Sequence, residues 1–148
     1  MNPELIAWLL SWAVFYTGYS MPDELPVVEF VPHSYFVKRT CFGIDTQKDP
    51  CNTRAMYDDN IDGVIFLDEK FENNIGGYVK TIIVHEMVHY LQDLTGDWEG
   101  IEDWQEVIRC QERAYRQREA YMVQDKFALD VYSRRRLLPR NYHPCGNN

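Results

Sequence analysis

His85-Glu86-Met87-Val88-His89 is the most informative segment of this sequence, and it lies within the largely apolar run from Gly77 to Gln92. Apolar residues recur in this run at helical spacing, and Thr95-Gly96 follows it with a helix stop signal. The run therefore predicts a helix. Positions i and i+4 of a helix share one face, so His85 and His89 would project side by side.

The two histidines and the glutamate between them suit zinc chemistry. Two neutral imidazoles at this spacing can share one zinc ion, leaving room for a third protein ligand and a water. Glu86 directly follows the first histidine, where its carboxylate can take a proton from the metal-bound water. The pattern predicts a Zn²⁺ site with His85 and His89 as ligands and Glu86 as the catalytic base; a coincidental match is the alternative.

Length and composition limit the classes of protein to which the chain can belong. The chain has 148 residues, which suits a single domain over 1–148, with 45% hydrophobic and 26% charged residues, as in soluble globular proteins. The net charge of −8 disfavours a nucleic-acid partner, because a phosphate backbone attracts basic surfaces. Solubility alone is a sufficient explanation for the charge.

The N-terminal segment is apolar but does not have the pattern of a signal peptide. No Lys or Arg occurs before Lys38, whereas a signal peptide begins with basic residues. Asn2-Pro3-Glu4 is typical of a helix start, and the apolar segment is too short to span a bilayer. We expect a helix ending near Thr17-Gly18, no signal peptide, no transmembrane helix and no membrane partner. The location is left open between the cytoplasm and non-classical export.

The remaining segments predict an α+β fold. Short strands are expected at 27–31, 55–57 and 63–67, with two or three of them pairing antiparallel. The segment 35–37 could be a strand or a short helical turn. Strand 63–67, just before the motif helix, could bind an extended peptide at its edge. A long helix is expected from about Glu102 to Tyr132.

Four cysteines permit two disulfides. Cys41 and Cys51 flank a polar, turn-rich loop and could form a local bridge, and Cys110 could pair with Cys145. In a reducing compartment all four would be thiols. A four-cysteine zinc site is disfavoured because no closely spaced pair is present.

A catalytic zinc needs a third protein ligand, which the long helix could supply as a carboxylate. A third histidine six residues after His89 is excluded, because Thr95 stands there. On the long helix, Glu112 and Glu119 share a stripe with apolar residues that should face the core. These apolar residues are Trp104, Ile108, Tyr115, Met122 and Leu129. We expect Glu119 as the metal ligand, Glu112 as the reserve, and ordinary ion pairs with arginines as the alternative for both.

Together, 85–92 and the segment 118–124 resemble the small gluzincin-type zinc metallopeptidases, the minigluzincin-like members of the HExxH zincins. The resemblance covers roughly residues 3–132. It implies a zincin-like order of N-terminal helix, small antiparallel sheet, motif helix and glutamate helix, with His85, His89 and Glu119 as zinc ligands. One position departs from the family pattern: the relatives' ligand glutamate stands three residues before the alanine, where this chain has Gln117.

The expected activity is zinc-dependent hydrolysis of a peptide or protein substrate, with Glu86 as the general base. His143, Tyr90 and Tyr121 are candidates for a donor to the oxyanion. One alternative is a non-catalytic, zinc-stabilised binding or regulatory protein of the same fold. Another is hydrolysis of a non-peptide amide, such as a cell-wall link. The sequence does not indicate an oligomeric state.

Overall fold

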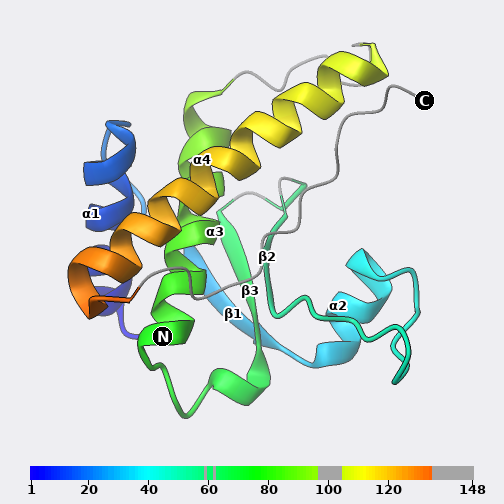
Figure 1. The fold of residues 1–148 in the computed structure, drawn as a ribbon. Helices are drawn as coiled ribbons and strands as arrows, with labels where there is room; N and C mark the ends of the chain where they lie inside the picture. The colour runs from blue at the N-terminus through cyan, green and yellow to red at the C-terminus, as the bar shows by residue number, and fades with distance from the viewer. Residues whose placement is uncertain (59, 62, 97–104, 135–148) are drawn as a thin grey trace.

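The computed structural model describes residues 1–58, 60–61, 63–96 and 105–134 of the chain. These residues form an α+β fold, as expected, in which helices surround a small sheet (Figure 1). The elements, in chain order, are α1 (Pro3–Thr17), β1 (Val27–Val31), α2 (His33–Thr40), β2 (Ala55–Tyr57), β3 (Val64–Asp68), the short 3₁₀ helix η1 (Glu69–Phe71), α3 (Gly77–Thr95) and α4 (Glu106–Tyr132).

The N-terminal helix begins and ends as its sequence predicts. The Asn2 side chain accepts a hydrogen bond from the backbone N–H of Glu4 at 2.7 Å, and Pro3 occupies the first turn. Gly18 ends α1 in the left-handed conformation with φ of 76°, which glycine adopts without strain. Within the described ranges, no helix combines the length and apolar character needed to cross a membrane.

The sheet is mixed, so the expected antiparallel sheet is correct for only one of its two strand pairs. The order is β1-β3-β2, with β2 antiparallel to β3 and β1 parallel to it. A parallel pair needs a long crossover connection, commonly with a helix, and here α2 begins that connection. The sequence prediction failed because the segment 35–37 gave too weak a signal to identify α2.

The central position of β3 excludes one sequence-based proposal. Both edges of β3 are paired, by β1 on one side and by β2 on the other. The strand expected at 63–67 therefore has no free edge for an extended peptide, and that prediction was wrong. Within the described sheet, β1 and β2 are the outer strands.

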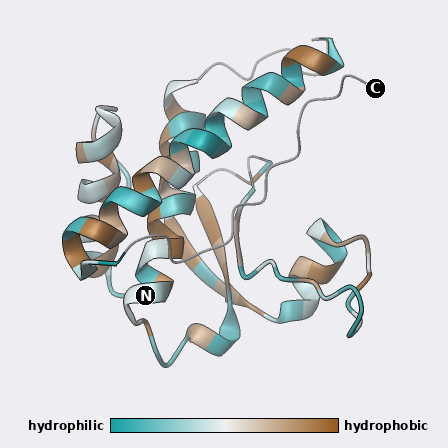
Figure 2. Ribbon diagram, viewed as in Figure 1, coloured by the Kyte–Doolittle hydropathy of each residue, from teal (hydrophilic) through white to brown (hydrophobic). Residues whose placement is uncertain are grey.

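The motif helix α3 lies at the centre of the molecule and is buried nearly all around. It packs against α1, α4 and the sheet (Figure 1). The core cluster joins apolar residues from all of these elements, among them Leu9, Ile65, Ile83 and Phe127. The strands carry mainly hydrophobic residues, whereas α4 carries many hydrophilic ones (Figure 2). This burial explains why α3 is apolar on more than one face.

The long helix α4 turns a different face to the core than the sequence predicted. The stripe of Ile108, Tyr115, Met122 and Leu129 lies 43–55% exposed, so its expected burial was wrong. Trp104 and the expected helix start at Glu102 lie outside the described residues. The buried residues of α4 are Arg116, Ala120, Tyr121, Val123, Gln124, Phe127 and Ala128. The inward face is partly polar because it meets the histidines of α3.

A disulfide closes the loop after α2. Cys41 and Cys51 are bonded, as their spacing suggested. The other expected pairing involves Cys145, which lies outside the described residues.

Candidate metal centre and catalytic base

His85 and His89 lie side by side on α3 and point their outer ring nitrogens at one another. The two Nε2 atoms are 3.3 Å apart, and the ring centroids are 5.0 Å apart. His85 is buried, and His89 is partly exposed. The structure thus brings together the two histidines that the sequence selected.

The inner nitrogen of each ring faces a glutamine oxygen. His89 Nδ1 lies 2.8 Å from Gln92 Oε1, and His85 Nδ1 lies 3.0 Å from Gln124 Oε1. The amide of Gln92 is oriented by its Nε2, which donates to the Arg116 carbonyl and to Glu119 Oε1 at 3.0 Å each. Because Gln92 is held in this orientation by its own hydrogen bonds, its oxygen accepts the Nδ1 proton of a neutral His89, which leaves a lone pair on Nε2 of that ring.

Gln117 of α4 completes the arrangement. Its Oε1 lies 3.0 Å from His85 Nε2 and 3.0 Å from His89 Nε2. Across the described ranges, no three His, Cys, Asp or Glu side chains gather in a way that could hold a metal. The third polar group beside the imidazoles is therefore an amide and not a carboxylate.

Glu119, the expected third ligand, lies on the other side of His89. Its Oε1 accepts hydrogen bonds from Tyr19 Oη at 2.5 Å and from Gln92 Nε2 at 3.0 Å. Glu119 is thus linked to the Nδ1 side of His89 through Gln92, and among the described ion pairs none joins it to a histidine. Burial of the phenol, together with this carboxylate, raises the pKa of Tyr19.

The reserve candidate, Glu112, also makes a different contact. Its Oε1 accepts from Arg116 Nε at 2.9 Å, one helical turn away on α4. This is the ordinary ion pair weighed as the alternative for that residue. The apolar stripe on the long helix favoured Glu119 and Glu112, and Gln117 was noted only as the position at which the relatives have their ligand glutamate.

Glu86 is buried between α3 and the sheet. Its Oε2 accepts a hydrogen bond from the backbone N–H of Tyr57 in β2 at 2.9 Å. Burial raises the pKa of Glu86, opposed by the charge of His89 and by the Tyr57 hydrogen bond. A carboxylate whose pKa is raised is a stronger base once it is ionised.

Burial also acts on the first histidine. Desolvation and the neighbouring His89 lower the pKa of His85 to about 3, opposed by the Gln117 and Gln124 oxygens, which can both accept hydrogen bonds at the same time only from the protonated ring. The His85 ring is therefore neutral near pH 7, which is the form that binds a metal ion.

The expected oxyanion donors have different surroundings. Tyr121 packs its ring edge-on against His85, with centroids 4.6 Å apart. Tyr90 donates its hydroxyl to the carbonyl of Glu24 at 2.8 Å. His143 lies outside the described residues. Tyr121 is thus the candidate that the structure places against the histidine pair.

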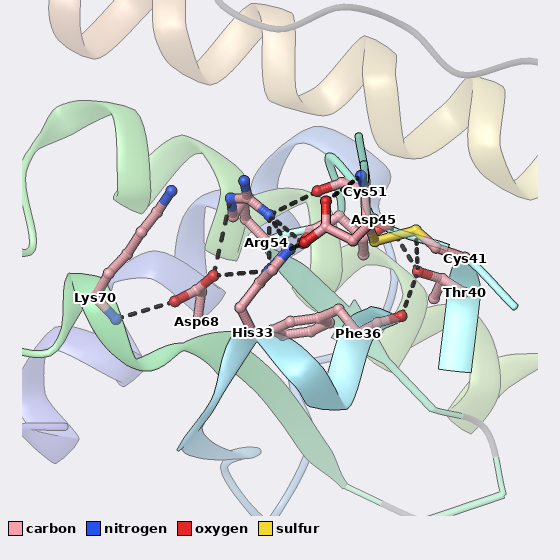
Figure 3. Close-up of polar contacts among 10 residues, drawn as sticks. His33, Phe36, Thr40, Cys41, Asp45, Cys51, Arg54, Asp68 and Lys70 are labelled. Carbon is pink, nitrogen blue, oxygen red and sulfur yellow. Dashed lines mark hydrogen bonds and ion pairs between the residues drawn. A yellow bond between two sulfur atoms is a disulfide. The ribbon is translucent and has the colours of Figure 1, made fainter. Parts of the chain in front are cut away.

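A separate polar cluster surrounds His33 at the start of α2 (Figure 3). His33 Nδ1 lies 3.2 Å from Asp68 Oδ2, and its Nε2 lies 3.4 Å from Asp45 Oδ2. Arg54 Nη1 contacts the same ring at 2.7 Å and also donates to the Cys51 carbonyl. These contacts tie α2, the disulfide loop and the end of β3 together, so His33 has a structural role here.

Comparison of the chain with protein-family models, with curated proteins and with solved structures gives no match in any of the three.

Proposed function

We propose that this protein is a zinc-dependent metallopeptidase in which His85 and His89 hold the metal and Glu86 is the general base. The observation that carries the proposal is the convergence of two Nε2 atoms, with a glutamine oxygen at the Nδ1 of each ring. Two such nitrogens fit a zinc ion, which binds neutral imidazole. Metal-binding histidines commonly donate their second N–H to an oxygen in this way.

Each residue of the site has a separate role in the proposed hydrolysis. A bound zinc ion supplies Lewis-acid polarisation of the substrate carbonyl and lowers the pKa of a water. Glu86 takes a proton from the attacking water and passes it to the leaving amine. Gln92 and Gln124 orient the two imidazoles, and Glu119 supports Gln92.

The hydrogen bond from Tyr57 to Glu86 favours a second candidate function. A carboxylate that joins α3 to β2 contributes to the fold without any catalysis. On this alternative the protein is a zinc-stabilised binding or regulatory domain. Zinc binding without hydrolysis would support it.

The decisive experiment compares the wild-type protein with Glu86→Gln. The amide oxygen can still accept the Tyr57 hydrogen bond but cannot remove a proton. We expect bound zinc to be retained and cleavage of a peptide library, followed by mass spectrometry, to fall by roughly 10²- to 10⁴-fold.

The matched control is Glu72→Gln, which changes an exposed carboxylate and should cleave at the wild-type rate. Full activity of Glu86→Gln on a substrate that the wild type cleaves would overturn the mechanism. Removal of zinc by a chelator should abolish cleavage by the wild type.

A further inference from the structure

Two imidazole nitrogens and one amide oxygen meet at the histidine pair. His85 Nε2, His89 Nε2 and Gln117 Oε1 lie 3.0–3.3 Å from one another. When both neutral rings carry their proton on Nδ1, beside the Gln124 and Gln92 oxygens, all three atoms are acceptors. Three lone pairs at these distances repel one another unless a cation lies between them.

The spacing of these atoms is close to that of ligands around a shared zinc ion. Zinc–nitrogen and zinc–oxygen bonds of about 2.0–2.2 Å, set at tetrahedral angles, place neighbouring ligand atoms roughly 3.3–3.6 Å apart. The distance of 3.3 Å between the two Nε2 atoms lies at the lower end of this range, and the two distances of 3.0 Å to Gln117 Oε1 are shorter, so a bound ion would move the amide outward slightly. The two nearby carboxylates that could compete, Glu112 and Glu119, are bonded to other residues.

We propose that the Gln117 side-chain oxygen is the third protein ligand of the metal, giving a ligand set of two imidazoles and one amide. This inference rests on the proposed zinc site. A glutamate in the same place would neutralise half of the charge of Zn²⁺, whereas the amide leaves all of it. The site should therefore bind zinc less tightly than a carboxylate site and hold an anionic group, such as a substrate carboxylate, more strongly at its open position.

Zinc titration of Gln117→Ala and Gln117→Glu tests the proposal. Zinc affinity is measured by competition with a chromophoric chelator. Loss of the amide should weaken binding by about 100-fold or more, since even indirect partners of a metal contribute 10- to 100-fold. The carboxylate has the same length and adds charge attraction, so Gln117→Glu should bind about tenfold or more tightly than wild type.

Controls on the same helix separate the outcomes. Gln111→Ala and Gln111→Glu make the same changes at an exposed position and should bind zinc like the wild type. Visible absorption of bound Co²⁺ should differ between wild type and both Gln117 variants, and circular dichroism confirms that each variant is folded. Wild-type affinity and an unchanged Co²⁺ spectrum in both Gln117 variants would show that the amide is not a metal ligand, overturning this proposal while the zinc site stands. Failure of the wild type itself to bind zinc would overturn the proposed function as well.

Discussion

At His89, the position of a single proton follows from a glutamine that cannot turn. Gln92 donates to the Arg116 carbonyl and to Glu119, so its oxygen must face His89 Nδ1. If Gln92 turned over, its oxygen would face those two acceptors and both hydrogen bonds would be lost. Arg116 and Glu119, which do not touch the ring, thus determine through Gln92 that Nε2 is the nitrogen of neutral His89 with a free lone pair.

The lowered pKa of His85 predicts acid sensitivity of the metal-free protein. The ring has a pKa of about 3 when folded and near 6.5 when unfolded. Between these values the unfolded chain binds more protons, so the free energy of unfolding should fall as the pH drops from about 6.5 towards 3. Thermal unfolding in the presence of a chelator measures this. The expected loss is several kcal/mol at the lower end.

His85→Asn is the companion variant for this measurement. Asparagine does not titrate, and its side-chain nitrogen can replace Nδ1 as the donor to Gln124. The decline in stability over this pH range should become shallower in the variant. An equally steep decline in both proteins would contradict the assignment to His85.

At the scale of elements, the end of α3 fits against α4 because residue 96 has no side chain. A Cβ added to Gly96 would lie 2.7 Å from the carbonyl oxygen of Gln92 and would also contact the Arg116 guanidinium. The backbone of Gly96 is extended, with φ of −84°, so steric contact and not conformation requires glycine here.

Gly96→Ala should therefore lower the free energy of unfolding by about 1–3 kcal/mol, the usual range for overpacking. Chemical denaturation measures the change. Gly76→Ala is the control, because the nearest atom to its added Cβ would be Asn74 Oδ1 at 3.8 Å. Equal stability of the two variants would show that the contact at Gly96 is readily relieved.

Local signals in the sequence predicted most of the elements but not how all of them pack. The caps of α1, the strands β1 and β2 and the motif helix were identified because each depends on nearby residues. The inward face of α4 was not identified, because the apolar residues that recur at heptad spacing along this helix lie on its solvent-exposed side. The part of α4 that faces the histidine pair carries polar residues, so the hydrophobic pattern pointed away from Gln117 and towards Glu119.

At the scale of the whole molecule, the disulfide loop and the helix pair are separate regions. The bond between Cys41 and Cys51 fixes a loop whose Asp45 reaches the His33 cluster (Figure 3). The loop contributes none of the described contacts to His85 or His89. Loss of the disulfide should therefore lower the free energy of unfolding but leave zinc affinity unchanged.

The double variant Cys41→Ala/Cys51→Ala tests this separation. Cross-linking residues ten positions apart removes chain entropy from the unfolded state worth about 3 kcal/mol. We expect a loss of unfolding free energy of about 2–3 kcal/mol in chemical denaturation, with zinc affinity unchanged. A large drop in zinc affinity would instead show that the loop supports the metal centre.

Glycines let α3 contact α4 near both ends of the motif helix, with Gly77 against the ring of Tyr132 and Gly96 against Arg116. These contacts fix the distance that a side chain at position 117 must cover to reach the imidazoles. Glutamine and glutamate have the same length, and their codons differ in a single base. One point mutation could therefore exchange a neutral side chain for a charged one beside the imidazoles without moving either helix, so the charge next to the histidine pair can change in evolution independently of the packing around it.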